Sequence, residues 1–380
     1  MALSINNWQG IFSFMNRLLL IIFTIIISST ASAQLNGDGY YRVQNQYSNR
    51  YIVVNSNKAK ANMSTNEVDL GALETYKSFD KIVSNPGSII YIENHGDNQY
   101  VLRAQGTNTL DMTGYYLKIR DNKNGTYKAY ATVSGVTKYL SDEPTTLSEG
   151  ILMTSGTKAR DWYIKPVDSK GDNYFGLTPD ISVGSDNYAT IYASFPFSFS
   201  SKGMNAYYIC KVDVERNVAV YKEITDVVPA STPVFVKCAS SKATENRLNL
   251  INKKTNPIND NLLAGVYFKN DNSTYYNQVA YDAATMRVLG KMSDGTLGFV
   301  KVNIDFLPAN KAYLKVPFSA SSEIRLMSVD EYATGIDDVF ADSVVDMKGI
   351  FTLTGLKVNM DVDALPSGVY IVNGKKVVVK

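Results

Sequence analysis

Histidine and cysteine, the side chains that most often supply a catalytic base, a nucleophile or a zinc ligand, are scarce in this sequence. The 380 residues include one histidine, His95, and two cysteines, Cys210 and Cys238. A Ser-His-Asp or Cys-His arrangement would have to use His95 as its base, but a histidine in a polar turn is far more often simply exposed. A structural zinc site needs four Cys or His ligands. We therefore expect no catalytic residue, no metal site and no cofactor.

Carboxylates could still supply hydrolytic chemistry, because a glycosidase needs only two of them and their spacing in sequence is free. The candidates occur mainly in turn-like polar segments, where solvated carboxylates are usual. They are Asp180, Asp186, Glu215, Asp226 and Asp282. We expect a protein that is not an enzyme, with a hydrolase in the central region as an alternative.

Polar residues in three turns offer another kind of chemistry, the recognition of sugar hydroxyls. Carboxylates, amides and guanidinium groups supply the acceptors and donors that vicinal hydroxyls require, and a nearby tyrosine offers an apolar face to a sugar ring. The second turn is the richest, because it gathers a carboxylate and two amides beside Tyr100. The predicted carbohydrate ligands are Asp97, Asn98 and Gln99 in that turn, Asn49 and Arg50 in the first, and Asp142 in the third copy.

These turns belong to a pattern that occurs three times between residues 39 and 171. Each copy has a short strand, a polar turn, an aromatic residue followed by aliphatics, and a closing strand. The copies are 41–43 with 51–53, 90–92 with 100–102, and 127–129 with 139–140, and their closing strands are 79–82, 116–119 and 162–164. Units this short must share one core. We expect Tyr51, Tyr100 and Tyr139 in that core.

The threefold pattern resembles the ricin-type β-trefoil, which implies a closed barrel with a hairpin cap and a carbohydrate-binding role. In that family an aspartate that holds the sugar follows the conserved aliphatic residue, and a Gln-x-Trp comes later. The matching positions here are Val53, Leu102 and Ser141, with Asp142 one place late, and the repeats contain no Gln-x-Trp. Low affinity at each site is therefore expected, with useful binding through multivalency.

Residues 173–333 follow a polar break at 168–172 and contain a duplication. Segments 206–209, 218–221 and 234–236 match 286–289, 297–300 and 313–315, and a Pro-Ala pair precedes the last strand of each half. Proline cannot donate to a strand ladder, so it marks a strand entry. Two hairpin-rich halves predict a β-sandwich. This region is similar to a sandwich module of secreted multidomain proteins in Bacteroidetes, which implies a structural or adhesive role.

The N-terminus has the pattern of a secretory signal peptide. Arg17 precedes an apolar run at 18–27, which is too short for a membrane span, and Ala31-Ser32-Ala33 predicts cleavage after Ala33. No later stretch is apolar for long enough to cross a bilayer. We expect a secreted or cell-surface protein. In an exported chain Cys210 and Cys238 could form one disulfide, and buried thiols fit equally well.

The C-terminal residues 346–380 follow a polar linker at 334–345. Asn373-Gly374 between two aliphatic runs predicts a type I′ hairpin. This end resembles closely the C-terminal sorting domains of type IX secretion, which implies the secretion machinery as a partner.

Helix signals are almost absent, so the chain is predicted to be all-β. The predicted domains are a signal peptide at 1–33, a β-trefoil at 34–172, a β-sandwich at 173–333, a linker at 334–345 and a small β unit at 346–380. With 38 Lys and Arg against 36 Asp and Glu, the sequence lacks the basic stripe of a nucleic-acid binder. We expect a non-catalytic protein that binds extracellular carbohydrate through the trefoil. The alternative is a structural or adhesin-like surface protein that binds a protein partner.

Overall fold

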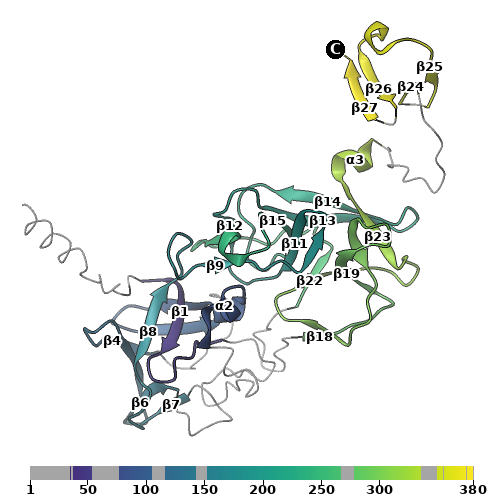
Figure 1. The fold of residues 1–380 in the computed structure, drawn as a ribbon. Coiled ribbons are helices and arrows are strands. Elements are labelled where there is room, and N and C mark those ends of the chain that lie inside the picture. The colour runs from purple at the N-terminus through teal and green to yellow at the C-terminus, as the bar shows by residue number, and fades with distance from the viewer. Residues whose placement is uncertain are drawn as a thin grey trace, which may run out of the picture. The chain divides into compact units, whose positions relative to one another are not determined.

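The computed structural model describes residues 35, 37–53, 77–104, 116–142, 152–266, 278–334 and 349–379, except 354 and 374 (Figure 1). The predicted signal peptide and most of the predicted linker lie outside these residues. Among them, only α2 (Phe79–Ile82) and α3 (Val329–Ala333) are α-helices, and strands account for most of the regular secondary structure. The all-β prediction is therefore confirmed. None of the helices in these ranges is both long and apolar enough to cross a membrane.

The chain divides into two compact units, Met1–Val329 and Asp330–Lys380. The first contains an eight-stranded N-terminal sheet and a ten-stranded sheet, and the second contains the C-terminal strands.

The pairing of the N-terminal sheet closes on itself. Its strands are β1 (Gly39–Asn45), β2 (Ile90–Asn94), β3 (Tyr100–Ala104), β4 (Lys118–Asp121), β5 (Tyr127–Val133), β6 (Val136–Ser141), β7 (Leu152–Thr154) and β8 (Trp162–Pro166). β1 pairs with β2 and β8, β8 with β5, and β5 with β4. β2 pairs with β3, and an isolated bridge from Tyr100 to Leu117 joins β3 to the start of β4. A closed ring of strands leaves no edge within it.

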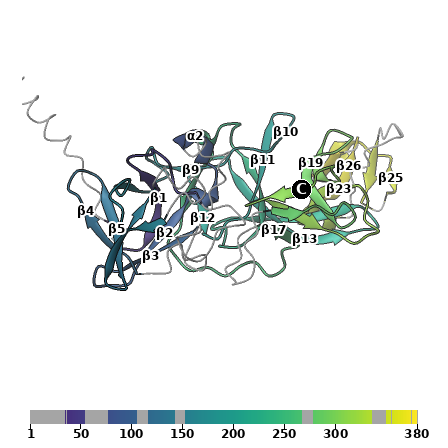
Figure 2. The ribbon, with the colours of Figure 1, turned by 90° about the horizontal axis from the view of Figure 1, so that it is seen from below.

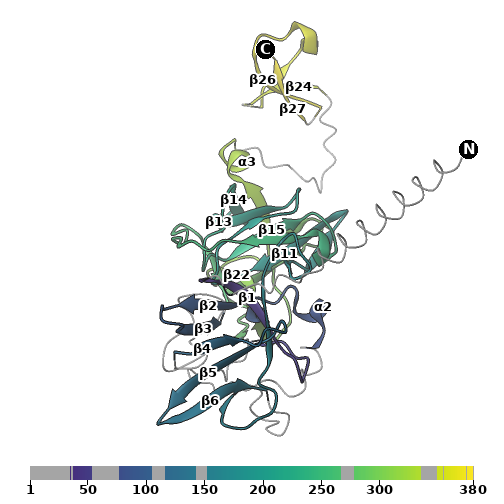
Figure 3. The same ribbon diagram turned by 90° about the vertical axis from the view of Figure 1, so that its left-hand side faces the viewer.

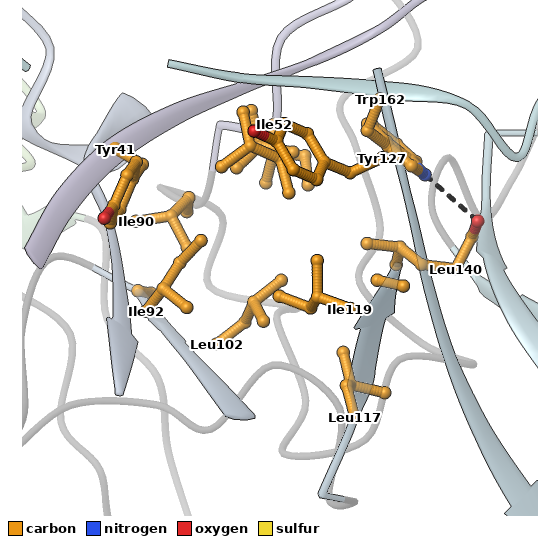
Figure 4. Packing of buried hydrophobic residues seen from close by; sticks show 14 of the residues in the cluster. Tyr41, Ile52, Ile90, Ile92, Leu102, Leu117, Ile119, Tyr127, Leu140 and Trp162 are labelled. Carbon is orange, nitrogen blue, oxygen red and sulfur yellow. Dashed lines mark hydrogen bonds between the residues drawn. The ribbon is translucent and has the colours of Figure 1, made fainter. Parts of the chain in front are cut away.

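All three sequence copies contribute to one core, as predicted. Strands supply Ile90 and Ile92, and the aliphatics after the turns supply Ile52, Leu102 and Leu140 (Figure 4). Trp162 is 1% exposed, and its indole nitrogen donates to the carbonyl of Leu140 at 3.0 Å. This shared core is what units too short to bury their own apolar faces require.

The prediction that the repeat tyrosines lie in the core holds only in part. Tyr51, Tyr100 and Tyr139 are all only partly buried. The fully buried positions are the aliphatics that follow them, such as Ile52 and Leu140. Tyr100 packs against the shared core and Tyr51 against the cluster of Val53 and Ile82, whereas Tyr139 precedes inward-facing Leu140 and so lies on the opposite face of β6.

The predicted closing strand at 79–82 is also wrong, because these residues form α2 and β1 pairs directly with β2. Ile82 is buried and packs with Val53, and Phe79 packs against the same cluster. Phe79, Ile82 and Val83 have the i, i+3, i+4 spacing that places three apolar side chains on one face of a helical turn. The closing strand predicted at 162–164 lies within β8, and the one predicted at 116–119 overlaps the start of β4.

The ten-stranded sheet shows the predicted duplication in its topology. Its strands are β10 (Ile181–Val183), β11 (Asp186–Ile191), β13 (Asn205–Asp213), β14 (Val218–Ile224), β15 (Val234–Cys238), β17 (Leu263–Gly265), β19 (Met286–Lys291), β20 (Leu297–Val300), β22 (Ala312–Lys315) and β23 (Glu323–Ser328). One half has the order β11-β15-β13-β14 and the other β17-β22-β19-β20. Each half therefore places its first strand beside its last. β23 joins them, parallel to β14 and antiparallel to β20.

Both faces of the ten-stranded sheet carry a core. Val234 and Val236 of β15 belong to one cluster and Phe235 between them to another. The first cluster includes residues of a three-stranded sheet formed by β12 (Phe197–Phe199), β16 (Arg247–Leu250) and β9 (Phe175–Gly176). A separate pair is β18 (Gln278–Ala280) with β21 (Phe306–Pro308). The layering fits a sandwich on one face of the sheet.

The polar break predicted at 168–172 is held in place by the rest of the unit. Arg247 donates to the carbonyls of Ser169 and Gly171 at 3.1 and 3.0 Å. Nearby, Phe79 of α2 contacts Tyr174 just before β9, with ring centroids 5.4 Å apart. Figure 2 shows α2 beside β9. Ile89 of the N-terminal repeats packs in the cluster that contains Phe175. The two sheets thus share a packed junction.

The C-terminal unit is a four-stranded sheet. Its strands are β24 (Ile350–Thr352), β25 (Lys357–Val358), β26 (Gly368–Val372) and β27 (Lys375–Val379), in the order β25-β24-β26-β27. Val372 pairs with Lys375 across two residues, and Asn373 has a φ of 51°. This confirms the predicted two-residue hairpin, whose turn requires positive φ.

Candidate binding site

The turn between β2 and β3 is held by its own hydrogen bonds. The amide of His95 donates to the carbonyl of Gln99, and the amide of Gln99 donates to that of Gly96, both at 2.8 Å. Asp97 and Asn98 take left-handed conformations, with φ of 49° and 56°, which Asn and Asp tolerate better than most residues. Both are exposed, whereas Gln99 is half-buried. The turn therefore presents a carboxylate and an amide to solvent from a fixed backbone.

Tyr116 lies beside this turn and was not among the predicted site residues. Its side chain is 56% exposed, and its ring meets that of His95 edge-on, with centroids 4.9 Å apart. His95 lies 3.4 Å from a carboxylate oxygen of Glu93, which also forms an ion pair with Arg103. The sequence signal was the alternation around Tyr116, with buried Leu117 and Ile119 between exposed residues. An exposed aromatic ring thus lies among polar and charged side chains.

Arg50 and Asp142, predicted as ligands for sugar, are partners of each other. Asp142 is 2% exposed and accepts from Nε of Arg50 at 2.9 Å and from a second guanidinium nitrogen. The hydroxyl of Ser48 donates to the same carboxylate. This pair ties the loop after β1 to the end of β6. Because these hydrogen bonds engage both the guanidinium and the carboxylate, neither group is well placed to bind a ligand.

Asn49, the remaining predicted ligand, is exposed and has a φ of 63°. Its side-chain oxygen accepts from Gln44 at 3.0 Å. None of the hydrogen bonds or ion pairs in the described ranges joins Asn49, Arg50 or Asp142 to the β2–β3 turn. The sequence-predicted residues therefore form two separate groups, of which only the turn has an exposed aromatic partner.

The carboxylates considered for hydrolysis are engaged or solvated. A hydrogen bond from Lys237 lowers the pKa of Asp186, and one from Thr285 lowers that of Asp282. Asp180 accepts from Lys311 at 2.6 Å, and Glu215 and Asp226 are exposed. A glycosidase acid needs a raised pKa, which is the opposite direction. Among the described residues, no three His, Cys, Asp or Glu side chains are grouped as metal ligands.

Cys210 and Cys238 are both free thiols. In the pairing of β13 with β15, Asn205 lies opposite Lys237, which puts Cys238 opposite the residue before Asn205. Cys210 is then six residues further along β13, about 20 Å at the rise of a strand. A disulfide requires Cα atoms within about 7 Å. Burial raises the pKa of the Cys238 thiol to about 12, so this thiol is protonated at neutral pH.

A groove of about 400 Å³ is lined by residues in and after α2 (81 and 84–86), by residues 177–178, by residues 189–191 of β11 and by residues 308–311. On its wall the hydroxyls of Ser84 and Thr178 are 2.7 Å apart. Its lysine Lys311 is already paired with Asp180. The groove includes none of the sequence-predicted site residues.

Comparisons with protein families, with curated proteins and with solved structures found no match.

Proposed function

We propose that this chain is a secreted or cell-surface binding protein, without catalytic activity, that recognises extracellular carbohydrate at the β2–β3 turn. The observation that carries the proposal is the exposed ring of Tyr116 against His95, in the turn that also presents the exposed side chains of Asp97 and Asn98. A tyrosine face covers the apolar C–H face of a sugar, and carboxylate and amide groups fix its hydroxyls.

The neighbouring charges support this proposal. The Glu93 and Arg103 ion pair crosses diagonally from β2 to β3, since Glu93 lies opposite Val101 and Arg103 opposite Tyr91. His95 packs edge-on against the ring of Tyr116. A platform that is fixed before binding loses less conformational entropy when the sugar arrives.

Tyr116→Ala should weaken glycan retention up to about tenfold, because an aromatic contact contributes about 0.5–1.5 kcal/mol beyond area burial. The double variant Asp97→Ala/Asn98→Ala should abolish retention. The measurement is affinity chromatography of the full mature chain on a panel of immobilised mucin and polysaccharides, with Trp162 fluorescence as a check of folding.

The matched control is Phe318→Ala, which removes an 80% exposed ring from the segment between β22 and β23. It should bind like the parent. The proposal is wrong if no glycan is retained, or if the turn variants and the control behave alike. Protein ligands then become the better hypothesis.

The C-terminal unit is proposed as the element for delivery or surface attachment. In its described part only Ile350 and Leu365 are buried hydrophobics, whereas Leu356, Met360 and Val378 are 50–69% exposed. Exposed apolar residues gathered on a small unit indicate a surface that another molecule covers.

Deleting residues 346–380 should abolish surface delivery and leave the unfolding midpoint of the N-terminal sheet unchanged. The reason is that this segment belongs to a compact unit other than the one that contains Trp162. Cell fractionation measures delivery, and denaturation followed by Trp162 fluorescence measures stability. Normal delivery of the truncated chain, or a lower midpoint, would contradict the proposed role.

A further inference from the structure

The exposed face that begins at Tyr116 continues along β4. Leu117 and Ile119 are buried, and Tyr116, Lys118 and Arg120 between and beside them are exposed. Alternate residues of a strand share a face, so these three side chains form one outward row.

The register extends this row across two more strands. Lys118 lies opposite Tyr130 of β5, and Tyr130 lies opposite Tyr139 of β6. Directly opposed residues of an antiparallel pair share a face. The rings of Tyr130 and Tyr139 are tilted by 39° with centroids 5.5 Å apart, and the guanidinium of Arg160 lies 4.2 Å from the Tyr139 ring centre. Figure 3 shows β2 to β6 following one another in this order.

Positive charge is concentrated here although the chain is nearly neutral overall. Arg120 lies opposite Lys128, and like charges directly opposite destabilise a strand pair. Lys128 is relieved by Asp161 at 2.9 Å. In the part of the chain that the structure describes, Lys118 and Arg120 have no carboxylate partner. An anionic ligand would supply the carboxylates that Lys118 and Arg120 lack.

We propose that this face, the aromatic–basic stripe of Tyr116, Lys118, Arg120, Tyr130, Tyr139 and Arg160, binds an acidic polysaccharide whose sugars carry carboxylates. The proposal rests on the proposed carbohydrate binding and names its ligand class. The rings supply stacking faces and the cations between them supply charge-assisted hydrogen bonds to carboxylates. Cations spaced by neutral rings suit a chain with separated charges better than the dense phosphates of a nucleic acid.

The stripe is long enough for several sugar residues. Tyr116 and Lys118 are two residues apart along one strand, about 7 Å, and two further strand spacings add about 10 Å. A polymer that contacts the whole stripe would engage three tyrosines at once. Weak contacts at each ring then combine in one binding event.

The test measures binding of the full mature chain to polygalacturonate and to its methyl-esterified, neutral form, at low and high salt. Lys118→Gln/Arg120→Gln should weaken binding of polygalacturonate about fivefold to tenfold and remove most of its salt dependence, since exposed charge contacts are screened. The same variant should leave binding of the neutral form unchanged. Tyr139→Ala should weaken both.

The control Lys202→Gln/Lys242→Gln removes the same charge from exposed lysines near the three-stranded sheet and should leave binding unchanged. If neutral glycans are retained in a Tyr116-dependent way but polygalacturonate does not bind, the ligand assigned to the aromatic–basic stripe is wrong. The proposed function then still stands. Absence of any glycan binding overturns both. Equal, Lys118-dependent binding of a single-stranded oligonucleotide would also overturn the assignment of the ligand.

Discussion

Arg42→Met should destabilise the N-terminal sheet by about 3–5 kcal/mol, the range expected when one partner of a buried charged network is removed. Arg42 is 1% exposed, and its guanidinium donates to Tyr174 O at 2.7 Å and to Val83 O, Ser88 Oγ and Asn173 Oδ1 at 3.1 Å each. Methionine fills much of the volume but satisfies none of these acceptors. Each buried acceptor left unpaired costs about 1–3 kcal/mol.

The charge of Arg42 is present at neutral pH and is stabilised by dipoles and rings. Burial lowers the pKa of the guanidinium to about 9, which leaves it protonated at pH 7. It lies 5.0 Å from the ring centre of Phe79 and 6.0 Å from that of Phe175, so cation–π attraction adds to the hydrogen bonds. Its partners come from the segment between β1 and β2 and from residues 173–174 just before β9. Arg42 therefore joins the two.

Trp162 gives a direct readout of this prediction, because the other tryptophan, Trp8, lies in the predicted signal peptide. In urea, the fluorescence and far-ultraviolet circular dichroism midpoints should coincide in the parent and separate in Arg42→Met. The control Arg120→Met removes an exposed arginine and should change stability by less than about 0.5 kcal/mol. If Arg42→Met changes the unfolding midpoint as little as the control does, the buried hydrogen-bond network of Arg42 contributes little to stability.

Local patterns in the sequence predicted much of this fold. Strand runs, the Asn373-Gly374 turn and the duplicated hairpins depend on residues close together in sequence, where alternation and turn chemistry act directly. The shared core followed from the threefold pattern. The strand prediction for residues 79–82 was wrong because four residues are too few to distinguish a helical period from a strand period. The apolar spacing of this segment fits one helical turn.

The interactions that sequence reasoning missed are those between distant residues. Arg42 reaches acceptors 41 to 132 residues away, and Arg50 and Asp142 are 92 residues apart. Tyr116 meets His95 through the folding of the second repeat, across 21 residues of sequence. Polar residues were correctly placed in turns, but which of them pair with each other depends on strand register across the whole sheet. Residues that bind a ligand and residues that form structural ion pairs are of the same types. They cannot be told apart until that register is known.

Replacing Arg50 and replacing Asp142 should lower the free energy of unfolding by different amounts, as expected of a structural ion pair. Arg50→Ala should destabilise the N-terminal sheet by about 3–5 kcal/mol, because it leaves the carboxylate of Asp142 buried with only Ser48 as a charge-stabilising partner. Asp142→Ala should cost less, about 2–3 kcal/mol, because the Arg50 side chain is 13% exposed and can turn toward water. Urea denaturation followed by Trp162 fluorescence measures both, since Trp162 donates to Leu140, two residues before Asp142.

The double variant should cost less than the two single changes together, since removing both partners leaves no buried charge. Gln46→Ala, an exposed change in the same loop, is the matched control and should be nearly neutral. Glycan retention per folded molecule should be unchanged in all of these variants, because the β2–β3 turn and Tyr116 are intact. If Asp142→Ala instead keeps parental stability and loses retention, this carboxylate is a ligand for sugar after all, and the site belongs at the end of β6.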